Sequence, residues 1–353
     1  MMAGMGWLAC RNSSNLRVCR SGEDKWLSLL TIGLLTHFFL LFVFPIIKAP
    51  AKLYQVPWPW MAMFHSMIAL AWIHDMRRSI RREDITFIFR FLGVLGAVLA
   101  GYMMLQYLNF DPLIWLIQSR FKEFKWFSEN HMIGLMGNPF HAAAALAVLV
   151  PAISYRAFHK GTLRWKVILY LSLMVMWLAQ SRVAFAAALV GALVASTKVR
   201  GVRAWLVSAG LALAGLAATI YLNPSVLMDR NRLVIWAQAL PHIQNHPFLG
   251  VGLNQFKLLN ITDPIPPGYA VRWAHNEWVH FATELGLLFT LFLALYLIRE
   301  AIKLSRTHKG FFACFVSALL LTPLHIPFHL APVLVVVGLG LVSSHLEPEK
   351  EYA

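Results

Sequence analysis

Between Val167 and Ser196 the sequence reads VILYLSLMVMWLAQSRVAFAAALVGALVAS, two apolar runs separated by the polar tripeptide Gln180-Ser181-Arg182. Each run is short for a helix that crosses about 30 Å of hydrocarbon, because such a helix takes about 20 residues. We therefore expect the tripeptide at the tip of a tight helical hairpin. This arrangement places Arg182 at one face of a membrane.

The composition of the whole chain predicts a membrane protein. Of the 353 residues, 59% are hydrophobic and 13% are charged, whereas about 25% of the residues of a soluble domain are charged. The formal net charge is +15, but the basic residues stand in short clusters between apolar runs, as the positive-inside rule requires. We expect contact with membrane lipids and none with nucleic acid.

Ten apolar segments predict an all-α polytopic protein with about ten transmembrane helices. The expected spans are 27–47, 57–75, 85–105, 131–154, 167–179, 183–196, 205–222, 276–298, 311–323 and 331–345.

The distribution of basic residues orients these spans. With the N-terminus in the cytoplasm, twenty of the 31 lysines and arginines lie on the cytoplasmic side and ten on the outer side, with Arg90 inside a span. The reverse orientation would invert this bias. The expected parts are a basic cytoplasmic segment (1–26), a single polytopic membrane domain (27–345) and a cytoplasmic tail (346–353).

The long loop 223–275, between the seventh and eighth spans, lies on the outer face in this orientation. Its apolar residues at helical spacing predict an amphipathic helix along the membrane or the bundle surface; they are Leu233, Trp236, Leu240 and Ile243. An arginine in the first turn is unfavourable for the helix dipole, so Arg230 and Arg232 suggest a negative partner such as phosphate. A salt bridge to Asp229 or Asp263 is the alternative for one of them.

Arg182 and His275 are the two other groups that could carry chemistry. A guanidinium at the depth of Arg182 costs a few kcal/mol, ~3 by insertion scales, unless it meets water, an anion or a carboxylate. It is either an anion ligand or an interfacial arginine that reaches the head groups. His275 begins a helix, where the dipole disfavours protonated imidazole, so a neutral proton acceptor or a structural histidine fits this place.

Glu284 and the glycines of the loop have more than one interpretation. In a regular helix Glu284 lies about 13 Å deeper than His275 and on the other side, so we expect it to orient an arginine or polar group of a neighbouring helix, or to form a structural pair. The segment 246–256 contains Gly250 and Gly252 but lacks a dinucleotide or phosphate-loop pattern, and it predicts a turn. The three cysteines have no metal-ligand spacing, and we expect neither metal nor cofactor.

Several of these segments together resemble the bacterial O-antigen ligase and polymerase superfamily of membrane glycosyltransferases, over residues 137–286. The matching pieces are Gly137-Asn138-Pro139, Gln180-Ser181-Arg182, Arg232 to Trp236 with Ala239-Leu240, His246 to Gly252, His275-Asn276 and Glu284-Leu285-Gly286. Ligases of this kind commonly have twelve spans, where ten are predicted here.

The resemblance implies a membrane glycosyltransferase fold of the C class in the bacterial inner membrane. It implies transfer of a glycan from undecaprenyl diphosphate to a hydroxyl group of lipid A-core or another acceptor, on the periplasmic face and without a metal. Arg182 and Arg232 would hold the diphosphate and His275 would act as general base. The other expected substrate-binding residues are Arg230, Asn276, Glu284, Gly250, Gly252 and Arg272.

Other functions share these motifs. A polymerase that extends lipid-linked glycan and a protein O-oligosaccharyltransferase use a similar donor site. A transporter of the lipid-linked glycan would need polar residues through several spans, whereas only scattered groups such as His37, His65 and Arg90 lie away from the outer face. A structural partner in a glycan-assembly complex would tolerate loss of Arg182 and His275.

Overall fold

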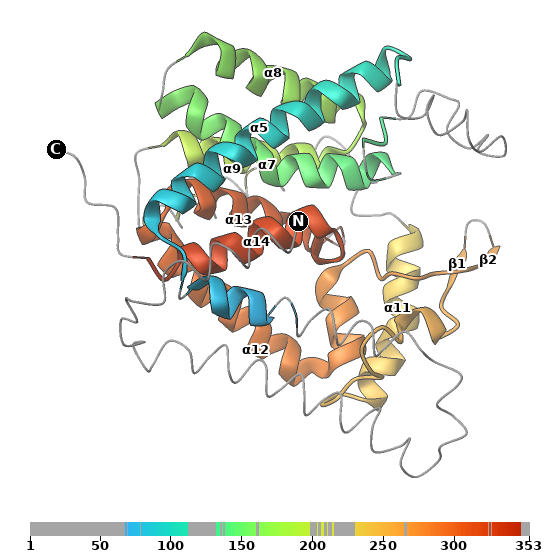
Figure 1. Ribbon diagram of the computed structural model, residues 1–353. Coiled ribbons are helices and arrows are strands. Elements are labelled where there is room, and N and C mark those ends of the chain that lie inside the picture. Colours follow the sequence, from blue (N-terminus) through green and yellow to red (C-terminus); the bar gives the residue numbers. More distant parts are fainter. Residues whose placement is uncertain are drawn as a thin grey trace. The chain divides into compact units, whose positions relative to one another are not determined.

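The computed structural model describes most of the chain between residues 68 and 346 and is predominantly helical (Figure 1). The described residues are 68, 70–77, 79–111, 132–134, 136, 138–159, 162–197, 203, 206, 207, 210, 214, 230–264, 267–323, 325 and 327–346. The predicted span 27–47 and most of spans 57–75 and 205–222 lie outside them. Among the described residues, three helices are long and apolar enough to cross a membrane; they are Glu83–Tyr107, Pro139–His159 and Glu277–Thr307.

The described residues belong to two compact units. The loop unit contains the described residues up to Asp84, together with Asn231–Ala274 and Trp278–Arg299. The bundle unit contains Ile85–Arg230, His275–Glu277 and the described residues from Glu300 onward.

The bundle unit is built around α7 (Pro139–His159), which packs against several helices. These neighbours are α8 (Leu163–Leu178), α9 (Arg182–Ser196), α13 (Lys309–Leu321) and α14 (Ala331–Ser343). α5 (Arg82–Tyr107) contributes Gly96, where an added Cβ would press on Leu149 and Ile153 of α7. The interior of α7 is mostly alanine and valine, and such small side chains let helix backbones approach closely.

The predicted helical hairpin is present, with α8 ending at Leu178 and α9 beginning at Arg182. Gln180 turns the chain with a positive φ of 55°.

Two hydroxyl groups form hydrogen bonds between helices of the bundle unit. Ser154 Oγ of α7 donates to Ala192 O of α9 at 2.8 Å, and Ser317 Oγ of α13 donates to Ala187 O of α9 at 2.9 Å.

The predicted start of the fourth span at residue 131 is wrong, because α7 begins at Pro139. Asn138 caps this helix: its side-chain oxygen accepts from the N–H groups of Phe140 at 2.8 Å and His141 at 3.3 Å. Proline suits the first helical position because it has no N–H to satisfy there. The residues before it form turns, and the Gly134 N–H donates to the Gln106 side-chain oxygen at 2.8 Å.

α12 continues beyond residue 298, the predicted end of the eighth span, and runs from Glu277 to Thr307. The helix is not regular. Gly286 has φ 82° and ψ 164°, which breaks α12 into two helical pieces. The polar and charged residues of its first nine positions therefore belong to a short helix that precedes the apolar piece.

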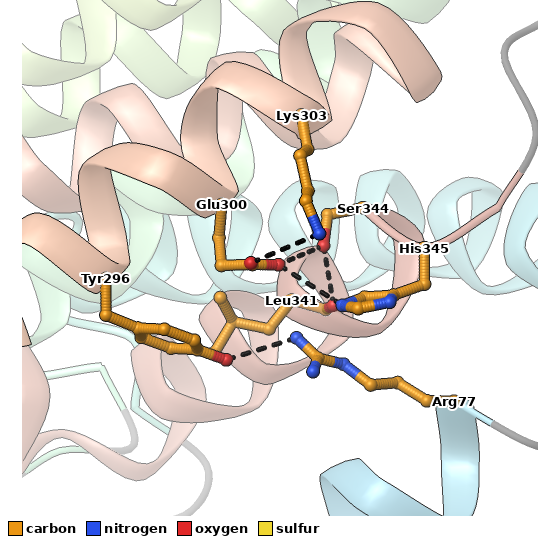
Figure 2. Close-up of polar contacts among 7 residues, drawn as sticks. All are labelled: Arg77, Tyr296, Glu300, Lys303, Leu341, Ser344 and His345. Atoms are coloured by element: carbon orange, nitrogen blue, oxygen red, sulfur yellow. Dashed lines mark hydrogen bonds and ion pairs between the residues drawn. The ribbon is translucent and has the colours of Figure 1, made fainter. Parts of the chain in front are cut away.

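A buried carboxylate fastens the last part of α12 to the end of α14 within the bundle unit. Figure 2 shows Glu300 receiving a hydrogen bond from Ser344 Oγ at 2.6 Å, with His345 Nε2 at 3.3 Å and Lys303 Nζ at 3.6 Å. The same view shows a hydrogen bond of the loop unit, from Arg77 Nη2 to the Tyr296 hydroxyl at 3.1 Å.

The loop unit contains α11 (Arg230–Asn245), the 3-10 turn η5 (Phe256–Leu258) and a small antiparallel hairpin of β1 (Thr262–Pro264) and β2 (Pro267–Ala270) (Figure 1). The prediction included no strand. The hairpin forms where Thr262 pairs with Ala270, and the Gln238 side chain continues it by bonding both the N–H and the carbonyl of Thr262, at 3.0 and 3.1 Å.

Part of the predicted apolar stripe of α11 faces away from the core of the loop unit. Leu233 and Leu240 are 46% and 50% exposed. The core side of the helix is formed instead by Ile235 and Ala239, with Trp236 packed beside them. These side chains face the core of the loop unit, whose other members are Phe256, Ile261, Val271 and Ala274.

Candidate functional site

Arg182 lies at one end of the bundle unit. The register of α9 against α13 fixes this position. Ser317 Oγ bonds Ala187 O, and an added Cβ on Gly191 would touch Ala313. The step from Ala313 to Ser317 along α13 thus corresponds to the step from Gly191 back to Ala187 along α9. One further turn brings the C-terminal end of α13 level with Arg182, the exposed first residue of α9.

His275 and Asn276 are brought to the same end. The Glu277 N–H donates to Thr322 O at 2.8 Å, and Thr322 directly follows α13. His275 stands two residues before Glu277 and is half-buried. The bundle unit therefore gathers a guanidinium, an imidazole and an amide, drawn from distant parts of the sequence, at one end of its helices.

The segment before Arg182 and the segment before α12 each contain a residue with an uncommon backbone conformation. Gln180 and His275 have φ 55° and 52°, in the left-handed region that costs a non-glycine residue roughly 1–3 kcal/mol. Histidine and asparagine adopt it more readily than most residues. The chain thus turns sharply just before Arg182 and again just before α12.

Two further histidines lie at this end, and the sequence reasoning missed both. His141 stands in the first turn of α7, and its ring centre is 5.6 Å from that of His325, which follows α13. The available signal was modest: each histidine stands at the edge of an apolar run, two residues from a proline. Their contact depends on how α7 and α13 pack, which hydropathy does not reveal.

In the loop unit Glu284 makes structural contacts, which was one of its two predicted roles. Glu284 is buried, and its two oxygens accept hydrogen bonds from the backbone N–H groups of Asn254 at 2.7 Å and Phe256 at 2.9 Å. His280 Nε2 lies 3.5 Å from the same carboxylate. Two backbone amides of the 246–256 segment thus donate to Glu284, which holds this segment in place. Bonds to an ionised carboxylate are stronger than those between neutral groups.

The predicted turn at 246–256 is present, and its two glycines have positive φ, 64° at Gly250 and 113° at Gly252. Backbone bonds tie it to the break in α12: Val251 N donates to Thr283 O at 2.8 Å and Gly252 N to Glu284 O at 2.9 Å. These glycines thus shape the loop, and contact with substrate stays a prediction for them.

The remaining predicted residues take different positions. Arg232 is half-buried and precedes Ile235 and Ala239 at helical spacing, so it stands on the core side of α11. Arg272 is exposed. The Trp236 Nε1–H donates to Ala274 O at 2.8 Å, which positions the chain just ahead of His275. Asp229 lies outside the described residues, and the structure does not describe the side chains of Arg230 and Asp263.

These groups suit recognition of an anion and movement of a proton. An arginine binds phosphate oxygens through its planar fork, and a neutral histidine accepts a proton near pH 7. Across the described ranges, no group of three or more histidine, cysteine, aspartate or glutamate residues could hold a metal ion. No protein-family model and no curated protein matches the chain.

Proposed function

We propose that this chain is a membrane glycosyltransferase that moves a glycan from undecaprenyl diphosphate to a hydroxyl group of lipid A-core, as an O-antigen ligase does. The reaction would take place on the periplasmic face of the bacterial inner membrane. The observation that supports this most is the position of Arg182 and the His275-Asn276 pair at one end of the bundle unit, because a glycosyl diphosphate donor needs a cation and a base close to the reacting carbon.

In this reaction Arg182 binds the diphosphate. The resemblance assigns the same role to Arg232, with Arg230 and Arg272 adding positive charge. The bond between the anomeric carbon and the phosphate oxygen breaks, and a bond to the acceptor oxygen forms. Fixed guanidinium groups stabilise the negative charge that develops on the departing diphosphate. Their contribution is larger where water is excluded.

His275 accepts the proton of the acceptor hydroxyl as the new bond forms. A positioned general base accelerates such a step by about 10²–10⁴-fold. Asn276 holds the substrate beside it. Glu284, Gly250 and Gly252 fix the shape of the 246–256 loop, and we also propose that they contribute to substrate binding.

The test is transfer by the purified protein in liposomes that contain undecaprenyl-diphosphate-linked glycan and lipid A-core. His275→Asn is the sharpest variant, because asparagine tolerates the positive φ while lacking a basic nitrogen. We expect product with the wild type and a loss of at least about 10²-fold with the variant. Full activity of His275→Asn would exclude the role as base.

The acceptor is decided by offering three of them to the same preparation: lipid A-core, lipid-linked glycan and a serine-containing pilin peptide. We expect product on lipid A-core. Product on lipid-linked glycan alone would make the protein a polymerase, and product on the peptide alone would make it a protein-directed transferase. Donor binding without product on any acceptor would support a transporter.

A further inference from the structure

The loop unit carries an apolar surface that its own core does not cover. On α11, Leu233, Val234 and Leu240 are 46%, 37% and 50% exposed, and they lie on the side away from the core. Just beyond the helix, Phe248 and Leu249 are 72% and 39% exposed. We call these five residues the α11 surface.

We propose that the α11 surface lies in the interfacial layer of a lipid bilayer, so that α11 rests flat on the membrane. This inference depends on the membrane location contained in the proposed function, and it is independent of the transfer reaction. The bound partner is the head-group and upper acyl region of the lipids.

The position of Phe248 beside α12 is the first reason. Leu287 N donates to Pro247 O at 2.7 Å, and an added Cβ on Gly286 would collide with the carbonyl of Phe248. Phe248 therefore lies at the break, where the apolar piece of α12 begins.

The apolar piece of α12 shows what covers this level of the molecule. Its exposed side chains include four leucines, Leu287, Leu288, Leu291 and Leu295, which are 51–66% exposed. α12 is long and apolar enough to cross a membrane. Exposed leucines on such a helix are covered by hydrocarbon. Phe248 and Leu249 therefore lie beside the end of that leucine surface at which the apolar piece begins. In a membrane this end lies at the depth of the lipid interface.

The charge of the segment is the second reason. From Arg230 to Arg272 the sequence contains four basic residues and one acidic residue. Helices that lie in the interface bury their apolar side about 5–10 Å below the boundary. Anionic head groups attract basic residues at this level.

The experiment is a depth measurement on the full chain in nanodiscs that contain phosphatidylglycerol. Single cysteines carrying a nitroxide replace Leu240, Phe248, Leu291 or Asn260 in a background without the native cysteines. Collision with oxygen reports hydrocarbon, and collision with a water-soluble nickel chelate reports water. Leu291 is the hydrocarbon reference, and Asn260, which is polar and exposed, is the water control.

We expect the oxygen-to-nickel ratio at Leu240→Cys and Phe248→Cys to be several-fold above that at Asn260→Cys, with Leu291→Cys deeper still. Nickel access at 240 and 248 equal to that at 260, with 291 still in hydrocarbon, would overturn the inference alone. Nitroxides at 240 and 248 shielded from both reagents would show a protein partner, and this too overturns it. Nickel access at 291 would contradict the membrane location, and the proposed function would fail with it.

Discussion

Gly250 and Gly286 meet backbone to backbone in the loop unit, and neither position has room for a side chain. An added Cβ on Gly250 would collide with the carbonyl of Glu284, and one on Gly286 would collide with the carbonyl of Phe248. Both residues have positive φ, 64° and 82°. The loop and the break in α12 therefore form one interlocked structure, and each needs a glycine.

This contact predicts that Gly250→Ala and Gly286→Ala are each destabilising. The added methyl group costs strain at positive φ, roughly 1–3 kcal/mol, and it forces two backbones apart. We expect a lower midpoint of thermal unfolding and faster proteolysis of the 246–256 loop. Gly101→Ala in α5 is the matched control, because an added Cβ there meets nothing within 4 Å. Equal midpoints for Gly250→Ala and Gly101→Ala would contradict the interlock.

Glu284→Gln tests the carboxylate that holds the same loop. Glutamine keeps one acceptor oxygen but turns an NH₂ group toward a backbone N–H, so one of the two bonds from Asn254 and Phe256 is lost. Leaving a buried donor without an acceptor costs about 1–3 kcal/mol. Hydrogen exchange at these two amides should accelerate by roughly 5–150-fold, by the free-energy conversion. Unchanged exchange would mean that Glu284 does not hold the loop.

Arg182→Lys and Arg182→Ala distinguish the effect of the positive charge of Arg182 from the effect of its planar guanidinium group. If the guanidinium stabilises the departing diphosphate, alanine should lower the transfer rate by about 10²–10³-fold. Lysine should restore only part of it, because an ammonium group cannot form the paired bonds of the planar fork. Arg164→Ala, at another exposed arginine of the bundle unit, serves as control. Transfer by Arg182→Ala at the wild-type rate would remove this residue from the site.

Glu300→Gln tests the attachment of α12 to α14. The neutral amide weakens the contacts with Lys303 and His345 while it can still accept from Ser344 (Figure 2). Lys303 is partly exposed and can turn to water, so we expect a moderate loss of about 1–3 kcal/mol. The measurement is thermal unfolding in detergent. The conservative Ser344→Ala change should show a smaller loss, and no loss with either variant would mean that this cluster adds nothing to stability.

The sequence allowed prediction of those features that depend on local polarity. The polar tripeptide between two apolar runs was enough to place the hairpin at Gln180 to Arg182. Hydropathy alone gave a wrong start for α7, because the Asn138 cap and Pro139 decide where that helix begins. It also missed the break at Gly286, because the partner that requires this conformation, Phe248, is distant in the sequence.

The candidate site likewise contains residues that the sequence could predict and residues that it could not. Arg182 and His275 could be singled out because charged and basic groups beside apolar runs are costly. The pair His141 and His325 could not, because their contact depends on the packing of α7 against α13. On α11, the choice of Ile235 over Leu233 as the core side chain depends on where Phe256 and Val271 lie, which periodicity does not determine.

The most direct measurement is a lipopolysaccharide gel from a bacterial host that lacks its own ligase and still makes lipid-linked O-antigen. The host expresses either the wild-type chain or His275→Asn, at matched levels in the membrane. If the protein is a ligase with His275 as its base, the wild type gives a ladder on lipid A-core and the variant gives none. No ladder from the wild-type chain would contradict the ligase function for this glycan and acceptor, and equal ladders from both would contradict the role of His275.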